Sequence, residues 1–445
     1  MISREPQLSV GIVEGSERVT GRLEGTFRDP DGTVVSGAFS AQQAGQEMTV
    51  LLDEGMRRYT GREILFLPAD NQAAVRLDDV TIGVRFHWER KEQQVFKGAL
   101  KLLHRPGQGI TAINQIPLEE YLASVISSEM SATAPAALLR AHAITSRSWL
   151  VAMLERARRA STPPHNRTPV SETTTAVVAW YTREDHSDFD VCADDHCQRY
   201  QGITKIISKS VEEAMRATRG QFLVFDDEVC DARFFKACGG RTEEFGSAWE
   251  PVDVPYLRSV SDAPEDLPPV KTEEDMHRWI AEPPAAYCNT ADAEVLKQVL
   301  PSFDQETTDF FRWTVSYSAE ELSALVFKKS GIDFGLLREI VPVHRGPSGR
   351  ITSLRLVGEK RTVTVGKELE IRRWLSPSHL YSSAFVVRTA HDEAGRAKEF
   401  ILKGAGWGHG VGLCQIGAAV MATRGMTEED IVLHYFRGAS LRTLY

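Results

Sequence analysis

Residues 116–130 read IPLEEYLASVISSEM, and at this point the sequence changes from a strand pattern to a helix pattern. The apolar residues here recur three or four positions apart, at Leu118, Tyr121, Leu122, Val125 and Ile126. This spacing places them on one face of an amphipathic helix. A second, Ala-rich helix is expected to begin at Pro135, because proline fits the first turn of a helix.

Strand patterns lie on both sides of this helical segment. Residues 8–113 contain short apolar runs, such as LSVGIV and VTIGVRFHW, with turn residues between them, which predicts a small all-β module. Strands return at 219–260 and again after residue 350. A helix is expected near 427–436, with Thr427 as its cap.

We therefore expect an α+β fold, with a mixed β-rich body and a helical segment that carries the chemistry. The expected domains are an N-terminal β-rich module at 1–113, a core formed by 114–264 and 346–445, and an inserted, partly helical α/β region at 265–345.

Composition excludes some classes of function. The net charge of −9 argues against a protein that wraps nucleic acid, because such a protein needs a basic surface. The sequence has no apolar run of about 18 residues, so no transmembrane segment is expected. No signal peptide is recognisable at the N-terminus. The protein either stays inside the cell or is exported by means of a segment outside this sequence.

Glu129 is the first candidate for catalysis. It follows Leu118 by eleven residues, or about three helical turns, and so projects from the apolar face provided that the helix reaches this far. Loss of hydration favours the protonated carboxyl that a general acid needs. A glutamate that caps the next helix, or pairs with an arginine, fits the spacing equally well. Glu119 and Glu120 point elsewhere and are expected to be solvated.

A possible metal site lies after the two expected helices, at residues 186–197. His186, Cys192, His196 and Cys197 fall within twelve residues. Thiolate and imidazole are the ligands of tetrahedral Zn²⁺, and four such ligands would form a closed, structural zinc site in a loop. A Cys192–Cys197 disulfide and a pair of free thiols are the alternatives.

Glycines alternate through residues 404–412, in GAGWGHGVG. This spacing is neither a phosphate-binding nor a dinucleotide-binding motif. The glycines are therefore expected to allow a close approach of the backbone to strands or to sugar rings. His409 lies inside this loop, where it could orient a ligand or form a structural hydrogen bond.

Two long stretches resemble the SpoIID family of sporulation proteins. Residues 117–154 contain a Leu-Glu-Glu-Tyr-Leu helix, a Glu-Met pair and an Ala-rich helix with an arginine, and residues 406–441 (GWGHGVGLCQIG onward) are similar to the closing motif of the family. Weaker matches span much of the remaining chain, at 86–90, 237–245, 256–262, 311–313 and 345–351.

The resemblance implies a lytic transglycosylase, a lyase that cleaves the MurNAc–GlcNAc bond of peptidoglycan and leaves 1,6-anhydro ends. Its substrate would be glycan strands stripped of stem peptides, and Glu129 would be the single acid/base. The residues implied in substrate binding are Arg147, Gln198, Lys236, His409 and Gln415. At Ala237 and Cys238 this sequence departs from many relatives, in which serine or threonine is common.

The resemblance also bears on cofactors, partners and location. Some relatives hold a zinc with a similar His/Cys set, and no cofactor is required for the chemistry. The implied partners are peptidoglycan strands and a wall amidase, and the implied location is the cell envelope. Two other functions stay open: a non-catalytic wall-binding module that enhances an amidase, and a cytoplasmic metalloprotein.

Overall fold

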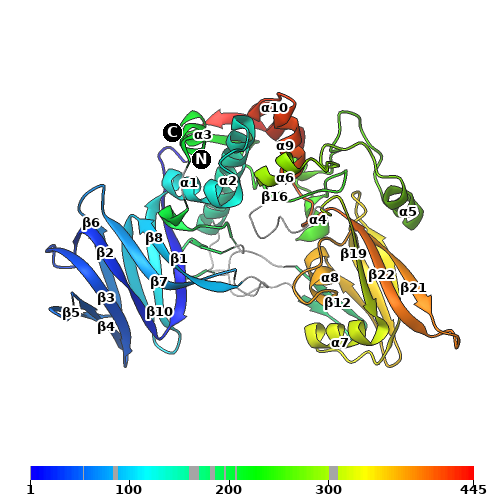
Figure 1. The fold of residues 1–445 in the computed structure, drawn as a ribbon, viewed down its shortest axis with the longest axis horizontal. Helices are drawn as coiled ribbons and strands as arrows, with labels where there is room; N and C mark the ends of the chain where they lie inside the picture. Colours follow the sequence, from blue (N-terminus) through cyan, green and yellow to red (C-terminus); the bar gives the residue numbers. More distant parts are fainter. Residues whose placement is uncertain are drawn as a thin grey trace. The chain divides into compact units, whose positions relative to one another are not determined.

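The structure is a computed structural model that describes residues 2–53, 55–83, 89–159, 170–180, 186–194, 197–205, 208–299 and 309–445. The chain divides into two compact units (Figure 1). The N-terminal unit contains Met1–Ala132, Arg183–Gln221 and Thr443–Tyr445, and the C-terminal unit contains Thr133–Thr182 and Phe222–Arg442. Both helices and strands build these units, which confirms the α+β fold class.

An antiparallel sheet dominates the N-terminal unit. Its strands run through the range expected for the β-rich module: β1 (Gln7–Ser16), β2 (Arg18–Arg28), β3 (Val34–Ala44), β4 (Glu47–Leu52), β5 (Arg57–Gly61), β6 (Glu63–Pro68), β7 (Ala74–Ile82), β8 (Arg90–Lys97), β9 (Ala99–Arg105) and β10 (Gly109–Pro117). Strand β10 lies between β1 and β9. The short β13 (Val191–Cys192) pairs in parallel with β1 and extends the sheet at its edge.

Helix α1 (Leu118–Glu129) follows β10 directly, with Pro117 as its N-cap residue. Its large apolar residues are buried: Leu118, Tyr121, Leu122, Val125 and Ile126. It packs against β10, against the short η1 (Gly202–Thr204), and against α3 (Lys209–Ala217), which begins at the capping side chain of Ser208. The period of 3.6 residues in the sequence thus corresponds to a helix packed into the unit.

A long helix, α2 (Ala136–Arg159), opens the C-terminal unit. All of its residues from Ala141 to Leu154 are buried. It packs against α9 (Gln415–Thr423) and α10 (Glu428–Tyr435). Thr427 and Asp430 form a capping box at the start of α10, so the helix expected near 427–436 and its cap are confirmed.

The rest of the C-terminal unit is built from small sheets. One sheet has the order β11-β12-β20-β19-β18, another β17-β22-β21, another β16-β23, and another β15-β14-β24. Their bounds are β11 (Val170–Glu172), β12 (Ala176–Ala179), β14 (Gln221–Phe225), β15 (Glu228–Val229), β16 (Phe234–Phe235), β17 (Arg312–Ser318), β18 (Leu337–Arg345), β19 (Ile351–Gly358), β20 (Thr362–Gly366), β21 (Phe385–His391), β22 (Ala397–Ala405), β23 (Leu413–Cys414) and β24 (Ser440–Thr443).

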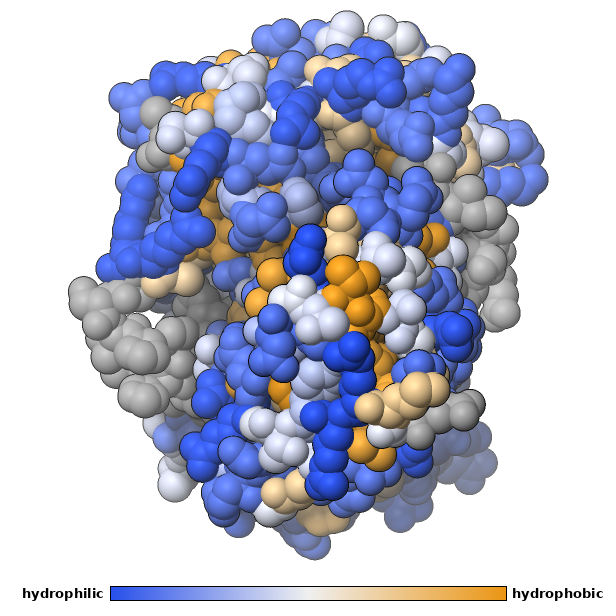
Figure 2. Space-filling model, turned by 90° about the vertical axis from the view of Figure 1, so that its left-hand side faces the viewer, coloured by the Kyte–Doolittle hydropathy of each residue, from blue (hydrophilic) through white to orange (hydrophobic). Residues whose placement is uncertain are grey.

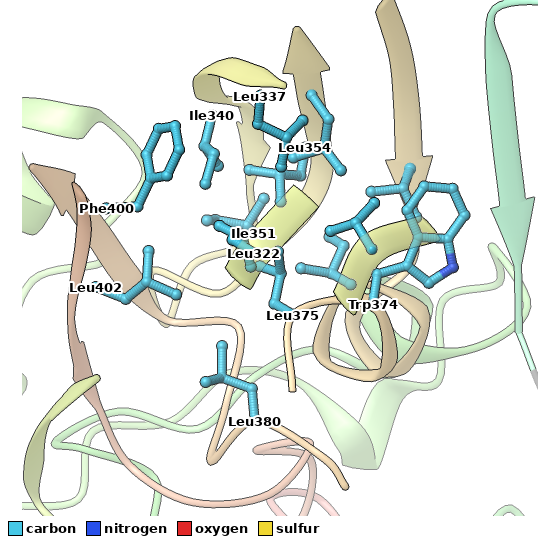
Figure 3. Close-up of a cluster of buried hydrophobic side chains, with 14 of the residues drawn as sticks. Leu322, Leu337, Ile340, Ile351, Leu354, Trp374, Leu375, Leu380, Phe400 and Leu402 are labelled. Atoms are coloured by element: carbon cyan, nitrogen blue, oxygen red, sulfur yellow. The ribbon is translucent and has the colours of Figure 1, made fainter. Parts of the chain in front are cut away.

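A hydrophobic core joins two of these sheets to helices α7 (Ala319–Ser330) and α8 (Glu368–Trp374). Figure 3 shows Leu322 and Trp374 from the helices among Leu354, Phe400 and other side chains from the strands. These four residues are at most 1% exposed. The core therefore fixes the strands that lead into the Gly-rich loop after β22.

Residues 265–345 contain both helices and strands. Helices α5 (Glu273–Ala281) and α6 (Ala293–Val299) come first, followed by β17, α7 and β18. Strand β17 pairs with β22, and β18 pairs with β19. The second half of this segment thus shares its sheets with strands from the C-terminal part of the chain. Two short helices, α4 (Phe245–Ala248) and η2 (Pro255–Leu257), precede it.

The face seen in Figure 2 is mostly hydrophilic, with hydrophobic residues gathered in small patches. Across the described residues, no helix combines the length and apolar character that a membrane span requires.

Candidate functional site

Glu129 is the last residue of α1, so the helix does reach it. Its side chain is half-buried, between the buried residues Ser128 and Met130. The backbone N–H of Met130 still donates to the carbonyl of Ile126, which holds the turn around Glu129 in helical register. The carboxyl thus stands on ordered backbone and keeps some contact with solvent.

The prediction that the side chain of Glu119 is solvated was wrong. It is 8% exposed. One of its carboxylate oxygens accepts a hydrogen bond of 2.6 Å from the hydroxyl of Tyr445, and another of 3.4 Å from the backbone N–H of Gly220. The residues that bury Glu119 come from distant parts of the sequence. Glu120 is exposed, as expected.

The segment that contains Gln198 packs against α1. The ring of Tyr200 stacks on that of Tyr121, with 4.9 Å between the centroids. The hydroxyl of Ser124 donates to the carbonyl of Gly202 over 2.7 Å. Gln198 itself is only 2% exposed. Burial raises the pKa of Tyr121 well above its usual value, and negative charge on the nearby cysteines and on Glu129 acts in the same direction.

Three of the four expected zinc ligands lie together in the N-terminal unit. Each of His186, Cys192 and Cys197 places one ligand atom within 4.8 Å of the others, and Nε2 of His186 is 3.4 Å from Sγ of Cys197. Neither of these two cysteines forms a disulfide in the structure. His196 lies outside the described residues. One imidazole and two thiols fit a tetrahedral zinc that takes one further ligand.

In the C-terminal unit, the structure joins Gln415 to His142, a residue that sequence reasoning missed. Nε2 of Gln415 is 3.0 Å from Nε2 of His142. An amide nitrogen only donates, so this ring nitrogen accepts. Nδ1 of His142 is therefore the protonated nitrogen, and it lies 3.2 Å from the hydroxyl of Ser146. Burial lowers the pKa of His142 to about 3, and the charge of Lys236 adds to this effect.

Lys236 follows β16, which pairs in parallel with β23. Its Nζ donates to the carbonyl of Val299, at the end of α6, over 2.8 Å. Its own carbonyl accepts from the N–H of Ile416 over 3.1 Å. Lys236 and Gln415 are thereby held in neighbouring segments, and the Lys236 side chain stays partly exposed.

His409 lies partly exposed in the Gly-rich loop. Its Nδ1 accepts from the N–H of Val411 over 3.1 Å, and its ring meets that of Trp249 edge-on, with 4.8 Å between the centroids. Gly410 has a φ of +85°, and a Cβ there would come within 2.4 Å of Cζ of Arg350. The close backbone approach expected of these glycines thus occurs against a buried arginine.

The expected site residues divide by exposure. Arg147, on α2, has no exposed surface, and Gln198 and Gln415 are each 2% exposed. Glu129, Lys236 and His409 are partly exposed. Only Glu129, Lys236 and His409 therefore reach solvent in this structure. Arg147, Gln198 and Gln415 contact other parts of the protein interior.

Comparisons with known proteins bear on the class of this protein. Residues 106–225, which include α1, α2 and the His/Cys segment, match the family model described as Stage II sporulation protein. Residues 243–412 match a model described as a domain of unknown function. The architecture and the first match define an α+β protein with a sporulation-protein domain.

Relatives extend the similarity beyond that domain. Stage II sporulation protein D of Bacillus subtilis is 24% identical over 333 residues, which cover 74% of this chain and 76% of that protein. Its counterpart from Bacillus amyloliquefaciens is 25% identical over 332 residues, covering 74% and 75%. An uncharacterized protein of Brachyspira hyodysenteriae is 24% identical over 330 residues, covering 74% and 67%. Residues 106–225 therefore resemble a domain of the SpoIID family, and the similarity to stage II sporulation protein D covers 74% of this chain.

Proposed function

We propose that this protein is a peptidoglycan lytic transglycosylase that cleaves glycan strands stripped of their stem peptides. The observation that carries the proposal is the position of Glu129. It is a partly exposed carboxyl at the ordered end of α1, within the range that matches the sporulation-protein model. A substrate of this kind lies in the cell envelope, so the proposal also implies an extracytoplasmic site of action.

The chemistry needs one carboxyl group that first gives and then takes a proton. Neutral Glu129 protonates the oxygen that leaves C1 of N-acetylmuramic acid, and the glycosidic bond breaks. The resulting carboxylate removes the proton from the C6 hydroxyl, whose oxygen bonds to C1 and forms the 1,6-anhydro ring. Glu129 ends protonated, as it began, and no water is consumed. A second carboxylate is unnecessary because the nucleophile belongs to the substrate.

The proposal gives the other residues two kinds of role. Lys236 and His409, which are partly exposed, contact the glycan. Arg147, Gln198 and Gln415 are buried and act as positioning residues that hold the helices and loops around them.

A zinc ion bound by His186, Cys192, Cys197 and His196 would have a structural role in this proposal. It would hold the segment that contains Gln198 against α1, since that segment already packs on the helix through Tyr200 and Ser124. The protein's own residues carry the acid/base chemistry.

The test is digestion of denuded glycan, followed by mass spectrometry of the products. The proposal predicts fragments with anhydro ends, whose mass equals that of the strand with no added water. Fragments that each carry an added water would reveal a hydrolase instead. Retention of the glycan without any cleavage, under conditions in which a known lytic enzyme works, would indicate a wall-binding module that enhances an amidase.

A further inference from the structure

We infer that Cys238, Asp262, Cys288 and Cys414 form a second metal site, which binds one zinc ion within the C-terminal unit. One ligand atom from each residue lies within 4.8 Å of all the others, and all four residues are buried. They come from four separate segments: the turn after β16, the loop after η2, the loop between α5 and α6, and the end of β23. This inference rests on these residues and is independent of the proposed glycan chemistry.

The spacing fits a single tetrahedral ion. With Zn–S bonds of about 2.3 Å, two sulfurs on one zinc are about 3.8 Å apart. The Sγ atoms of Cys238 and Cys288 are 3.4 Å apart, so binding requires only a small movement. Three thiolates with one carboxylate are a ligand set of the kind that zinc accepts. An iron–sulfur cluster would instead need ligands spread over several iron atoms.

Backbone N–H groups already point at the sulfurs. Sγ of Cys414 accepts from the N–H of Cys238 over 3.3 Å and from that of Gly417 over 3.4 Å. Sγ of Cys238 accepts from the N–H of Gly240 over 3.3 Å. Such donors stabilise thiolates, the form that binds metal. Cys414 is also the N-cap residue of α9, where the helix dipole favours negative charge.

Hydrogen bonds also fix the position of the Asp262 carboxylate. One oxygen of Asp262 accepts from the hydroxyl of Tyr435 over 2.6 Å, and the other accepts from the N–H of Cys288 over 2.8 Å. A Cβ at residue 417 would lie 2.3 Å from both Asp262 Oδ1 and the Tyr435 hydroxyl. Gly417 therefore leaves the space that this pair occupies. Partners of this kind orient the ligands of a metal.

Two arginines near the cluster, one buried and one partly buried, offset part of its negative charge. Arg350 is fully buried and donates to the carbonyl of Cys238 over 3.2 Å. Arg312 donates to the carbonyl of Gly239 over 3.1 Å. Three thiolates and a carboxylate with one Zn²⁺ would leave two negative charges, which the two guanidinium groups partly offset, since Arg350 also interacts with Glu243 and Glu368. The surroundings are thus suited to an occupied site, because buried charge requires compensation.

A zinc ion here would be structural, since four protein ligands leave no open position. It would tie the turn after Lys236 to the start of α9, and so fix the carboxyl ends of the parallel strands β16 and β23. The metal would stabilise the part of the C-terminal unit in which Lys236, His409 and Gln415 lie.

The test measures zinc per chain in the purified full-length protein by mass spectrometry of the metal. The double variant Cys192→Ser/Cys197→Ser removes the ligands of the first candidate site, and it should still retain one zinc per chain. In that background, Cys288→Ser and Cys414→Ser should each lose this zinc. Cys230→Ser is the matched control, because Cys230 is a buried cysteine of the same unit outside the cluster, and its replacement should leave the zinc in place.

A second measurement separates loss of metal from loss of folding. Serine is a good N-cap residue, so Cys414→Ser should keep α9 and its circular dichroism spectrum while it loses a ligand. With Co²⁺ in place of zinc, the double variant should show thiolate-to-cobalt absorption, and Cys414→Ser should weaken it. The inference would be overturned by a double variant that holds no metal, by full zinc retention in Cys414→Ser, or by a Cys238–Cys288 disulfide in the unreduced protein.

Discussion

The side-chain nitrogen of Gln415 lies 3.0 Å from Nε2 of His142 and joins helix α9 to helix α2 across 273 positions of sequence. Both residues are buried, so this contact is an internal tie and not a surface interaction. It depends on a neutral histidine, since the protonated ring would have no acceptor to offer the amide.

This contact predicts a specific dependence of stability on pH. The pKa of His142 falls from about 6.5 in the unfolded chain to about 3 in the folded one. Between these values the unfolded state binds the extra proton, so stability rises with pH. The contribution of neutral His142 is complete above about pH 6.5 and decreases as the pH falls toward 3, by about 1.4 kcal/mol per pH unit.

His142→Gln should remove this dependence. Urea unfolding at pH 7 and at pH 4.5 measures the free energy of unfolding of both proteins, and the gap between wild type and variant should narrow at the lower pH. If the difference in free energy of unfolding between wild type and variant is the same at both pH values, the lowered pKa of His142 would be contradicted. His391→Gln, at an exposed position on β21, serves as the control and should follow the wild type at both pH values.

The proposed mechanism predicts that Glu129→Gln strongly reduces glycan cleavage while binding to denuded glycan persists. General acid/base catalysis contributes about 100- to 10,000-fold, so turnover should fall by at least about 100-fold. Glu120→Gln replaces an exposed glutamate of the same helix and should keep full activity. Equal activity of the two variants in a product assay would remove Glu129 from the mechanism.

Tyr445→Phe should destabilise the N-terminal unit. It removes the 2.6 Å hydrogen bond to Glu119 and leaves a buried carboxylate with fewer donors, at a cost of about 1–3 kcal/mol. The thermal midpoint should therefore fall. Glu120→Gln, whose side chain is exposed, should change the free energy of unfolding by less than about 0.5 kcal/mol. A midpoint that is identical in Tyr445→Phe and the wild type would show that the contact adds nothing.

Leu354→Ala tests the core shown in Figure 3. Leu354 has no exposed surface, so truncation should cost about 2–5 kcal/mol through lost burial and the cavity that remains. Val343→Ala on the neighbouring strand β18 is the control, because Val343 is 53% exposed and its truncation should cost about 0.5 kcal/mol or less. Denaturant unfolding compares the two directly.

The helices and many of the strands were predictable because their signals are local. The apolar period after Leu118 predicts α1, and Thr427 marks the start of α10 through contacts with its own first turn. Strand β19 coincides with the apolar run ITSLRLVG. In each case, the residues that determine the element lie within it or directly beside it.

The features that escaped prediction depend on distant segments. The local sequence predicts that Glu119 is a surface charge, but in the fold Tyr445 and Gly220 donate hydrogen bonds to its carboxylate. The cluster of Cys238, Asp262, Cys288 and Cys414 was not predicted, because its residues are spread over the sequence without the spacing of a known motif. Cys238 was noted only as a departure from many relatives. His142 carried a weak local signal, as a lone histidine in an apolar helix, which is more often structural than functional.

The burial of α2 has a consequence for synthesis of the chain. This helix is buried on every side between Ala141 and Leu154, and two of the elements that cover it, α9 and α10, come near the end of the sequence. As the ribosome makes the protein, α2 emerges long before those covering helices exist. The nascent chain therefore exposes the apolar side chains of α2 to solvent during much of translation. We therefore expect truncations before residue 415 to aggregate, because they lack the helices that cover α2.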